Sequence, residues 1–284
     1  MENKNNTIQA RKKIFIVLKK LGIPLFGVCS FEKLEQDLIS CRAKSRLPQH
    51  AKSVICMLFP YRVEIKKRNL SRYAVIRDYH DVVMGYLKKA CSSLQKEYPN
   101  SQFVPFCDNS PIPEKKAAIL SGLGVIGDNQ LLINQEYGSY VFIGEIVTDL
   151  LIQADDAEAK GCLHCGACGK SCPTGALLED GFQKENCLSF LTQKKKELTY
   201  QEEQWIKKGG SIWGCDICQD CCPFNQTAKT TKIKEFLEGL HPIIKIGDYD
   251  RLQNRAFAWR PKTVIERNLR ILAQKSEDTS KGNK

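Results

Sequence analysis

Nine of the chain's 14 cysteines lie between Cys162 and Cys222 and follow a regular spacing. The segment opens with the run C-x-x-C-x-x-C-x-x-x-C-P and closes with the run C-x-x-C-x-x-C-C-P, while Cys187 stands alone between them. The opening run has the spacing of bacterial ferredoxins, in which three close thiolates hold one 4Fe-4S cluster and the fourth, before proline, reaches a second cluster. The spacing therefore predicts a segment folded around two iron-sulfur clusters.

The number of available thiols supports this prediction. Two clusters need eight thiolates, at four per cluster. The opening run offers four and Cys187 a fifth, and the closing run supplies Cys215, Cys218 and one of the adjacent pair Cys221 and Cys222. Zinc is the main alternative because C-x-x-C pairs also bind zinc, but zinc modules rarely place a third and fourth cysteine at these intervals before proline.

A disulfide framework fits this cysteine pattern less well. Disulfides persist in oxidising compartments, and the polar, charged residues from Met1 to Lys13 lack the apolar core of a signal peptide. No stretch approaches the roughly 18 consecutive apolar residues of a membrane span. We therefore expect a cytoplasmic protein without a membrane partner.

The part of the chain before the cysteines has the pattern of an α+β domain over residues 1–152. Apolar residues recur at helical spacing from Thr7 to Leu21 and again from Val82 to Leu94. Four short β-like runs are interleaved with these helices: Leu25–Cys29, Val54–Leu58, Phe103–Phe106 and Ser139–Thr148. Because 42% of the residues are hydrophobic, the domain has enough apolar side chains for a buried core.

Two further segments follow this domain. Residues 153–228 form the expected double-cluster domain, entered through an acidic linker over 153–160. Residues 229–284 form a basic helical segment in which Ile265, Leu269 and Leu272 make one apolar stripe, and its last ten residues are expected to be disordered. The formal net charge of +11 favours an anionic partner, with nucleic acid the first candidate.

Several blocks of the chain resemble epoxyqueuosine reductases, and they occur in the same order as in that family. Before the cysteines, these blocks are S-R-Y-A-V-I-R-D-Y-H (71–80), F-C-D-N-S-P-I-P-E-K (106–115), G-L-G-V-I-G-D-N (122–129) and E-Y-G-S-Y-V-F-I-G-E (136–145). Within the cysteine-rich part they are C-L-S-F-L-T (187–192) and G-C-D-I-C-Q-D-C-C-P-F-N (214–225). The resemblance covers roughly residues 45 to 272.

The resemblance implies a nitroreductase-like domain that binds cobalamin, followed by a ferredoxin-like domain with two 4Fe-4S clusters. In the family, electrons from an external low-potential donor pass through the clusters to the cobalt. The reduced corrin then removes the epoxide oxygen of epoxyqueuosine in a tRNA anticodon loop, and the product is queuosine. The resemblance therefore implies an oxidoreductase of queuosine biosynthesis.

The resemblance also assigns roles to single residues. It places Cys162, Cys165, Cys168 and Cys222 around one cluster and Cys172, Cys187, Cys215 and Cys218 around the other. Asp108 matches the acid that protonates the departing oxygen, a role that requires a raised pKa, although D-N-S-P from Asp108 is also a good turn sequence. Arg77, Tyr79 and His80 lie in a block beside the corrin, with His80 as a polar contact rather than a cobalt ligand.

The chain departs from the family pattern at positions that bear on the substrate. Val125 and Asp128 stand where the family usually has a bulky residue and a lysine, and Cys221 stands at a usually apolar position, which we interpret as a buried small side chain. Family members commonly continue past the position of Leu272 into helical repeats that contact tRNA. We therefore expect weak tRNA binding through phosphate contacts from the basic residues of the last segment: Arg251, Arg255, Arg260, Lys262, Arg267 and Arg270.

Two alternatives to this function remain open. A paralogue would keep the corrin and the clusters but reduce a small molecule. An electron-transfer protein would reduce a partner corrinoid protein without substrate chemistry of its own. The block around Asp108 favours an enzyme, because an electron carrier needs no acid.

Overall fold

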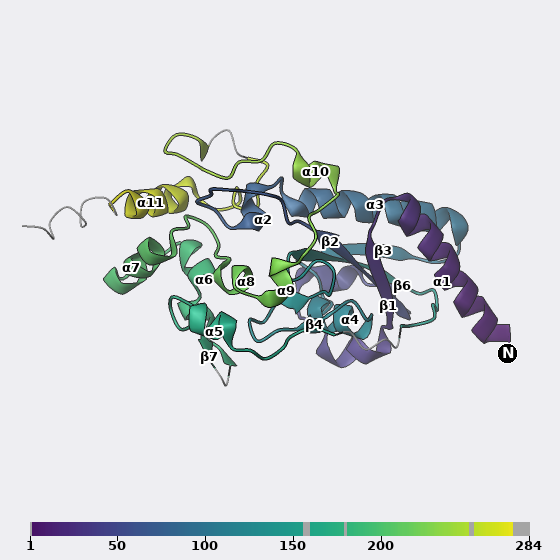
Figure 1. The fold of residues 1–284 in the computed structure, drawn as a ribbon. Helices are drawn as coiled ribbons and strands as arrows, with labels where there is room; N and C mark the ends of the chain where they lie inside the picture. The colour runs from purple at the N-terminus through teal and green to yellow at the C-terminus, as the bar shows by residue number, and fades with distance from the viewer. Residues whose placement is uncertain (1, 156–159, 179–180, 250–252, 275–284) are drawn as a thin grey trace, which may run out of the picture. The chain divides into compact units, whose positions relative to one another are not determined.

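The computed structural model describes residues 2–155, 160–178, 181–249 and 253–274, and the chain forms two compact units (Figure 1). The first unit comprises Met1–Pro60, Tyr79–Ile126 and Leu132–Gly161, and the second comprises Tyr61–Asp78, Gly127–Leu131 and Cys162–Lys284. This division differs from the three consecutive segments expected from the sequence. Two short segments from the first half of the chain, and the basic C-terminal segment, belong to the unit that contains the cysteine runs.

Hydrogen bonds between distant residues explain this grouping. The backbone N–H of Ile212 donates to the carbonyl of Asn69 at 2.8 Å. The side-chain amide of the fully buried Asn268 donates to the carbonyls of Thr192 at 2.7 Å and Ile212 at 2.8 Å. Leaving such a buried group unpaired would cost about 1–3 kcal/mol. These bonds therefore join the early and late segments to the cysteine-rich part.

The first unit is built on an antiparallel sheet with the strand order β1-β2-β6-β3. Its strands are β1 (Leu25–Ser30), β2 (Ser53–Pro60), β3 (Phe103–Cys107) and β6 (Val141–Thr148). Each of them overlaps one of the β-like runs of the sequence, so the predicted α+β class is confirmed. Every residue of β2 is buried, because this central strand is covered on both faces of the sheet.

Helices cover the two faces of this sheet. They are α1 (Glu2–Lys20), α3 (Tyr79–Glu97) and α4 (Glu114–Leu120). On one face, Phe59 of β2 packs against Tyr86 of α3 with ring centroids 5.8 Å apart. On the other face, Leu58 joins a buried cluster with Ala117 and Ala118 of α4. The alternation of Leu58 and Phe59 between the faces follows from the two-residue repeat of a strand.

The first helix agrees with its sequence pattern. Ala10, Ile14 and Leu18 recur every fourth residue along α1 and are buried. The helix stops where Gly22 adopts a left-handed conformation with φ 74°, and the N–H of Ile23 bonds back to the carbonyl of Leu18 at 3.1 Å. The same unit contains the short elements η1 (Glu32–Asp37), η2 (Arg42–Arg46), β4 (Val125–Ile126) and β5 (Leu132–Ile133).

The second unit is built mainly from short helices. They are α2 (Arg72–Val75), α5 (Ala167–Ser171), η3 (Lys184–Asn186), α6 (Leu188–Thr192), α7 (Tyr200–Gly209), α8 (Ile217–Asp220), α9 (Pro223–Gln226), α10 (Lys234–Leu237) and α11 (Lys262–Ala273). A two-stranded hairpin of β7 (Leu177–Leu178) and β8 (Gly181–Phe182) accompanies them. In its core, the indole N–H of Trp213 donates to the hydroxyl of Tyr73 at 2.8 Å, and its ring packs edge-on against Phe257.

The last helix buries a slightly different stripe from the one expected. Val264, Ile265 and Ile271 are buried on α11, whereas Leu269 and Leu272 lie at the edge of the core. The expected disordered tail, 275–284, lies outside the described residues, as do 156–159 of the expected linker. The described start of that linker is anchored to the first unit, because the Asp155 carboxylate accepts from the N–H of Val28 at 2.8 Å. Within the described ranges, no helix is long and apolar enough to cross a membrane.

Candidate functional site

The first cysteine run forms a tight loop followed by a short helix in the second unit. His164 and Gly166 adopt left-handed backbone conformations with φ 51° and 69°, which turn the chain sharply before α5. Cys168 lies on α5, and Cys172 directly follows this helix. Because Pro173 comes next and proline cannot continue a helix, the chain changes direction at Cys172.

The second run repeats this arrangement. Cys215 precedes α8 and Cys218 lies on it, while Cys222 caps the start of α9 with Pro223 as its first residue. The helices α5 and α8 pack against each other. The two cysteine-bearing helices are therefore neighbours, although they lie far apart in the sequence.

Electrostatic interactions divide the thiols into two groups. Burial is the main cause of the raised pKa of Cys215 and Cys218, and the charges of Cys172 and Cys187 raise both pKa values further. The pKa of Cys222 is raised by burial and then by Cys162 and Cys221. The last cysteine of each run therefore lies with cysteines of the other run. This is the crossed arrangement that ferredoxin spacing predicts.

The other two predicted ligands of the first run, Cys165 and Cys168, differ in their surroundings. Burial raises the pKa of Cys168, and the charges of Asp128 and Cys221 add to the shift. Cys165 is exposed. The structure thus relates Cys168 to the group that contains Cys162 and Cys222 through their common neighbour Cys221.

The surroundings of the thiols fit metal ligation. Burial raises the pKa of Cys215 to about 12, so the neutral thiol is favoured unless positive charge lies close by. Bound iron supplies that charge and converts thiols into thiolates. At Cys172 burial also raises the pKa, but hydrogen bonds from Thr174 and from the backbone N–H groups of Ala176 and Leu177 lower it overall. Such donors stabilise the sulfur of an iron-sulfur ligand.

Cys221 has a hydrogen-bond partner of its own. Its thiol donates to the carbonyl of Cys218 across 3.5 Å. It is also an electrostatic neighbour of Cys168 and Cys222. The structure therefore places Cys221 beside one thiol group, and the choice between Cys221 and Cys222 as ligand remains a prediction.

Asp128, which stands where the family usually has a lysine, contacts a histidine of the first cysteine run. The carboxylate of Asp128 contacts Nδ1 of His164 at 2.7 Å, and His164 lies between the first two cysteines of the opening run. The ligand atoms of Asp128, Cys162 and His164 all lie within 4.8 Å of one another. Asp128 thus has a polar partner in the cysteine loop.

Asp108 lies in a strained turn of the first unit, directly after β3. Its φ of 61° is left-handed, a conformation that aspartate tolerates better than most residues. The N–H of Ser110 bonds back to the carbonyl of Asp108 at 2.7 Å. The side chain of Asp108 is 58% exposed and contacts Nε2 of His80 at 3.0 Å. The backbone conformation thus agrees with the expected turn, whereas the role of Asp108 as the proton donor stays a prediction.

The pKa of Asp108 is shifted in the direction opposite to the one expected. The hydrogen bond from His80 lowers its pKa and outweighs the raising effect of burial, and Tyr79 lowers it further. The contact uses the Nε2 atom of His80. Tyr79 stacks between His80 and Phe142, with ring centroids 4.0 Å and 4.1 Å apart. Arg77, the third predicted corrin contact, is an exposed residue of the second unit.

Two acids near Asp108, the buried Glu145 and the half-buried Glu114, were not predicted from the sequence. Glu145 on β6 is only 1% exposed, and it accepts a hydrogen bond from the hydroxyl of Ser110 at 2.7 Å. Burial raises its pKa well above the usual range. Burial also raises the pKa of Glu114 to about 7, with a further contribution from the charge of Asp108. A glutamate inside the apolar run V-F-I-G-E-I-V-T was the available sequence signal for Glu145.

Two of the basic residues expected to contact phosphate bind backbone carbonyls within the second unit. Arg255 is 3% exposed, and its guanidinium donates to the carbonyls of Val75 and Gly239. Arg267 donates to the carbonyls of Lys194 at 2.8 Å and Lys196 at 3.0 Å. The buried guanidinium of Arg255 needs such partners, so the expectation that Arg255 faces a nucleic acid is wrong. Arg267 is half-buried, and its contact with a nucleic acid stays a prediction.

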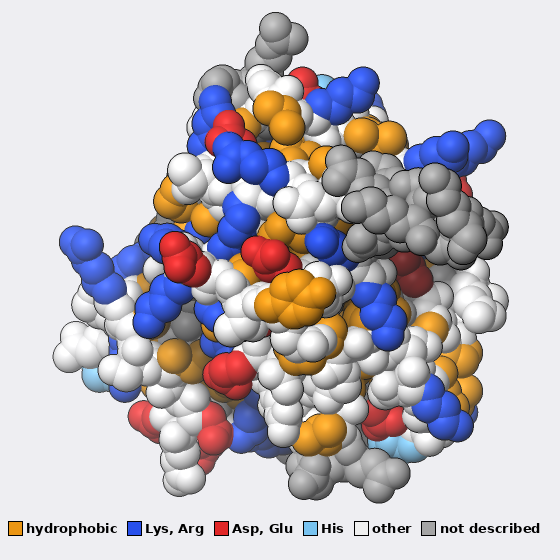
Figure 2. All heavy atoms as spheres, turned by 90° about the vertical axis from the view of Figure 1, so that its left-hand side faces the viewer, with side chains coloured by type: hydrophobic (Ala, Val, Ile, Leu, Met, Phe, Trp, Pro, Cys, Tyr) orange, Lys and Arg blue, Asp and Glu red, His pale blue; other side chains and the backbone are white. Residues whose placement is uncertain are grey.

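The other basic residues of that group differ in their surroundings. Arg260 stacks on the ring of Trp259 at 3.9 Å. Lys262 and Arg270 both lie near Glu266 on α11, and Arg251 lies outside the described residues. Figure 2 views the protein from the left-hand side of Figure 1 and shows Lys and Arg side chains interspersed with acidic and hydrophobic ones on that face.

Two family models match the chain. The model described as "Epoxyqueuosine reductase QueG, DUF1730" matches residues 42–109. The model described as "4Fe-4S double cluster binding domain" matches residues 161–225. The second match confirms that the cysteine runs belong to a double-cluster domain.

Curated relatives carry the same family name. The epoxyqueuosine reductase of Aliivibrio fischeri is 34% identical over 198 residues, which cover 69% of this chain and 52% of the relative. That of Leadbetterella byssophila is 34% identical over 232 residues, which cover 78% of this chain and 74% of the relative. The chain thus spans between about half and three quarters of the length of these relatives.

Solved structures extend the likeness to the fold. Epoxyqueuosine reductase from Streptococcus thermophilus has a TM-score of 0.80 at 25% identity, covering 95% of this chain and 82% of that chain. An epoxyqueuosine reductase crystallised with an epoxyqueuosine-modified tRNA stem loop has a TM-score of 0.79 at 22% identity, covering 96% and 83%. A reductive dehalogenase described with a B12-dependent mechanism has a TM-score of 0.52 at 15% identity, covering 95% and 36%.

The last two structural likenesses show the fold alone. The identity to the Leadbetterella byssophila protein extends over more than two thirds of both chains. Together with the two matched family models, it shows that this chain belongs to the epoxyqueuosine reductase family.

Proposed function

We propose that this chain is an epoxyqueuosine reductase, which removes the epoxide oxygen of epoxyqueuosine in tRNA and forms queuosine. The observation that carries the proposal is that the chain combines two groups of thiols with the exposed Asp108, which contacts His80. An electron carrier needs the thiols but has no use for an acid in a strained turn. The family membership supports the choice of substrate.

The cysteines are proposed to act as ligands of two 4Fe-4S clusters. The crossed grouping of the thiols supports an assignment of four ligands to each cluster. The first cluster takes Cys162, Cys165, Cys168 and Cys222, and the second takes Cys172, Cys187, Cys215 and Cys218. The clusters would accept single electrons from an external low-potential donor.

The first unit is proposed to contact cobalamin. Tyr79 and Phe142 form a partly exposed aromatic stack with interplanar angle 8°, and the polar pair of His80 and Asp108 lies at its edge. An apolar ring system with polar substituents fits such a surface, and Arg77 stays a predicted corrin contact. When bound, cobalamin would supply the electrons that break the carbon–oxygen bonds of the epoxide. Since Nε2 of His80 already contacts Asp108, we assign His80 a polar contact rather than a cobalt bond.

Asp108 and its neighbours are proposed to supply protons. Removing an epoxide oxygen as water requires two electrons and two protons, and it leaves a carbon–carbon double bond. Because the pKa of Asp108 is lowered by His80, the carboxylate is ionised at neutral pH and must receive its proton from a neighbour. His80 at 3.0 Å can deliver one proton. Glu114, whose pKa of about 7 leaves it partly protonated at neutral pH, is a second source.

The small-molecule alternative is favoured by one observation. Arg255 and Arg267, two of the basic residues expected to contact phosphate, are bound to backbone carbonyls within the second unit. A substrate without a phosphate backbone would not need them. The alternative keeps the clusters, the corrin and Asp108, and it changes only what is reduced.

An anaerobic assay separates these functions. The protein is reconstituted with iron, sulfide and cobalamin, and it is supplied with a strong reductant and tRNA that contains epoxyqueuosine. We expect queuosine in the recovered tRNA, and its formation should require cobalamin. Reduced clusters together with unchanged tRNA would favour the small-molecule alternative if free epoxides are consumed, and the electron carrier if they are not.

A further inference from the structure

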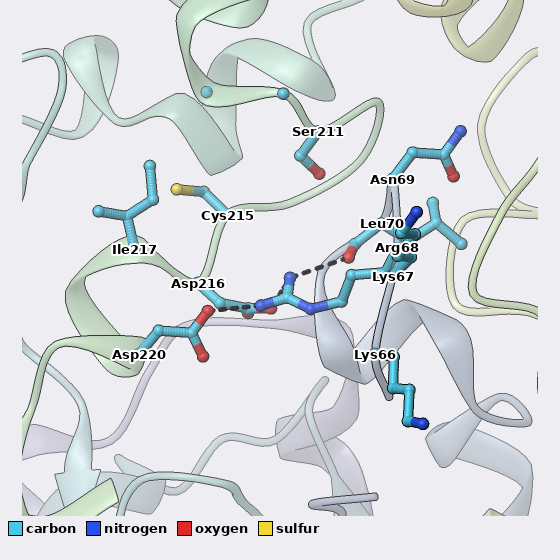
Figure 3. Close-up of a pocket in the computed structure, with 12 residues that line it drawn as sticks. Lys66, Lys67, Arg68, Asn69, Leu70, Ser211, Cys215, Asp216, Ile217 and Asp220 are labelled. Atoms are coloured by element: carbon cyan, nitrogen blue, oxygen red, sulfur yellow. Dashed lines mark hydrogen bonds and ion pairs between the residues drawn. The ribbon is translucent and has the colours of Figure 1, made fainter. Parts of the chain in front are cut away.

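The second unit contains an open pocket beside one of the thiol groups. Its volume is about 500 Å³. It lies between the segment 66–70, the end of α7 and the start of α8 (Figure 3). The residues that line it are Lys66, Lys67, Arg68, Asn69, Leu70, Gly209, Gly210, Ser211, Cys215, Asp216, Ile217 and Asp220.

The acids of this pocket are neutralised by arginines. Arg68 contacts the carboxylate of Asp216 at 2.9 Å and that of Asp220 at 2.5 Å. Asp220 also contacts Arg72 at 3.2 Å. Figure 3 shows Arg68 reaching across to these acids. Both negative charges of the lining therefore already have a positive partner.

Two lysines of the pocket are left with uncompensated charge. Lys66 and Lys67 are exposed. Among the described residues, neither of them forms an ion pair, and Figure 3 shows Lys66 lying apart from both acids. The last turn of α7 adds Lys207 and Lys208 directly before Gly209. The pocket thus presents positive charge to an approaching partner, which favours an acidic one.

The pocket also gives access to a cluster ligand. Cys215 lines it, and Cys215 belongs to the thiol group with Cys172, Cys187 and Cys218. A Cβ added at Gly210, another lining residue, would meet nothing within 4 Å, so the pocket has free space at that residue. Electron transfer by tunnelling weakens exponentially with distance, so a donor docked here would be well placed to reduce the cluster held by that group.

We propose that this pocket is the docking site of an acidic, low-potential redox protein that reduces the cluster held by Cys172, Cys187, Cys215 and Cys218; the proposal rests on the proposed function. Each docking event transfers one electron, which oxidises the donor by one electron and reduces the cluster by one. Two events supply the two electrons of the epoxide reduction. RNA fits the pocket less well, because none of its lining side chains is an aromatic on which a base could stack.

Reduction kinetics test the docking site. The double variant Lys66→Glu/Lys67→Glu is compared with the unmodified protein, both reconstituted with iron and sulfide, in anaerobic stopped-flow mixing with reduced plant-type 2Fe-2S ferredoxin. Charge steering changes association rates by about 10- to 1,000-fold. We therefore expect cluster reduction to slow by roughly 10-fold or more at low salt. The rate of the unmodified protein should fall as salt rises.

Three controls make the result specific. The variant Lys88→Glu/Lys89→Glu reverses another exposed pair, which lies on α3 and does not line the pocket, and it should leave the ferredoxin rate unchanged. Dithionite, a small reductant, should reduce all proteins at the same rate. The variant Lys66→Gln/Lys67→Gln, which removes the charge without reversing it, should give an intermediate rate. Iron content and thermal unfolding of each variant show whether it has folded.

Each other outcome overturns a defined part of the proposal. Equal ferredoxin rates in the Lys66→Glu/Lys67→Glu variant and the unmodified protein, with normal dithionite reduction, would overturn the docking site and leave the proposed function standing. Weaker tRNA binding with an unchanged ferredoxin rate would make the pocket an RNA contact and likewise overturn redox docking. Protein that binds no iron, or whose clusters dithionite cannot reduce, would overturn the proposed function and the docking site together.

Discussion

The thiol groups and the surroundings of Asp108 are assembled in different ways. The thiols come from two short cysteine runs and Cys187, and each run places its ligands on one loop and one short helix. The acid site combines His80 at the start of α3, Asp108 after β3 and Glu145 in the middle of β6. The first arrangement depends on local chain geometry. The second depends on the register of a sheet and on how helices pack against it.

The pKa values of Cys215 and Asp108 are also shifted in opposite directions in the two regions. Burial raises the pKa of Cys215 and Cys218, so these thiols need a bound cation to ionise. Asp108 is exposed and has a basic partner, which lowers its pKa and keeps it ionised. The difference suggests that the thiol region is organised by what it binds, whereas the acid region is organised by its own side chains.

The largest expected effect concerns the adjacent cysteines. Cys222→Ser should lose one cluster, which is roughly half of about eight iron atoms per chain, and with it turnover. Cys221→Ala should keep both clusters, because the Cys221 thiol is bonded to the carbonyl of Cys218. Iron analysis and the visible spectrum after anaerobic reconstitution measure the difference. If Cys221→Ala loses iron while Cys222→Ser keeps both clusters, Cys221 is the cluster ligand instead of Cys222. Cys91→Ala, which lies away from both runs, serves as the control.

The next effect concerns the acid. Asp108→Asn should lower kcat by roughly 100-fold or more, as expected when a general acid is lost. Asparagine also tolerates the left-handed conformation of this turn, so the fold, iron content and corrin spectrum should stay unchanged. Single-turnover rates with epoxyqueuosine-containing tRNA provide the measurement. A variant that fails to fold or to bind cobalamin would show that Asp108 is only a turn residue.

A smaller effect is expected in the pH dependence of stability. The pKa of Glu114 is raised from its usual 4.5 to about 7, so the folded protein binds the proton more tightly than the unfolded chain. Stability therefore falls as the pH rises from about 4.5 through 7, by roughly 2–3 kcal/mol from this residue. Glu114→Gln should remove this loss. The stability of the variant relative to the unmodified protein should therefore be greater at pH 8 than at pH 5. Denaturant unfolding at both pH values tests this, and an equal difference at the two values would refute it.

The smallest expected effect concerns the bond that supports the Asp108 turn. Ser110→Ala removes the hydroxyl that donates to the buried Glu145 at 2.7 Å. The free energy of unfolding should fall by about 1–3 kcal/mol, the usual cost of leaving a buried polar group without its partner. Ser45→Ala is the matched control, because its hydroxyl bonds to a backbone carbonyl on the exposed surface. A loss no larger than that of the control would mean that Glu145 finds another partner.

The sequence by itself determined the parts of the protein that local patterns encode. The strands and helices of the first unit follow from apolar repeats such as Ala10, Ile14 and Leu18. The cysteine spacing predicted the double-cluster domain, because the reach of a short loop limits which thiols can share a cluster. Sequence blocks alone also identified the family.

Only the tertiary structure decided which charged residues are available and which acids interact. The sequence does not distinguish Arg255 and Arg267 from surface arginines. In the structure, however, they donate to the backbone carbonyls of Val75 and Lys194, which are far away in the sequence. The pKa values of Asp108 and Glu114 depend on neighbours that the fold brings together. Burial and long-range pairing set the cost of a charge, and both arise only when segments distant in sequence pack against one another.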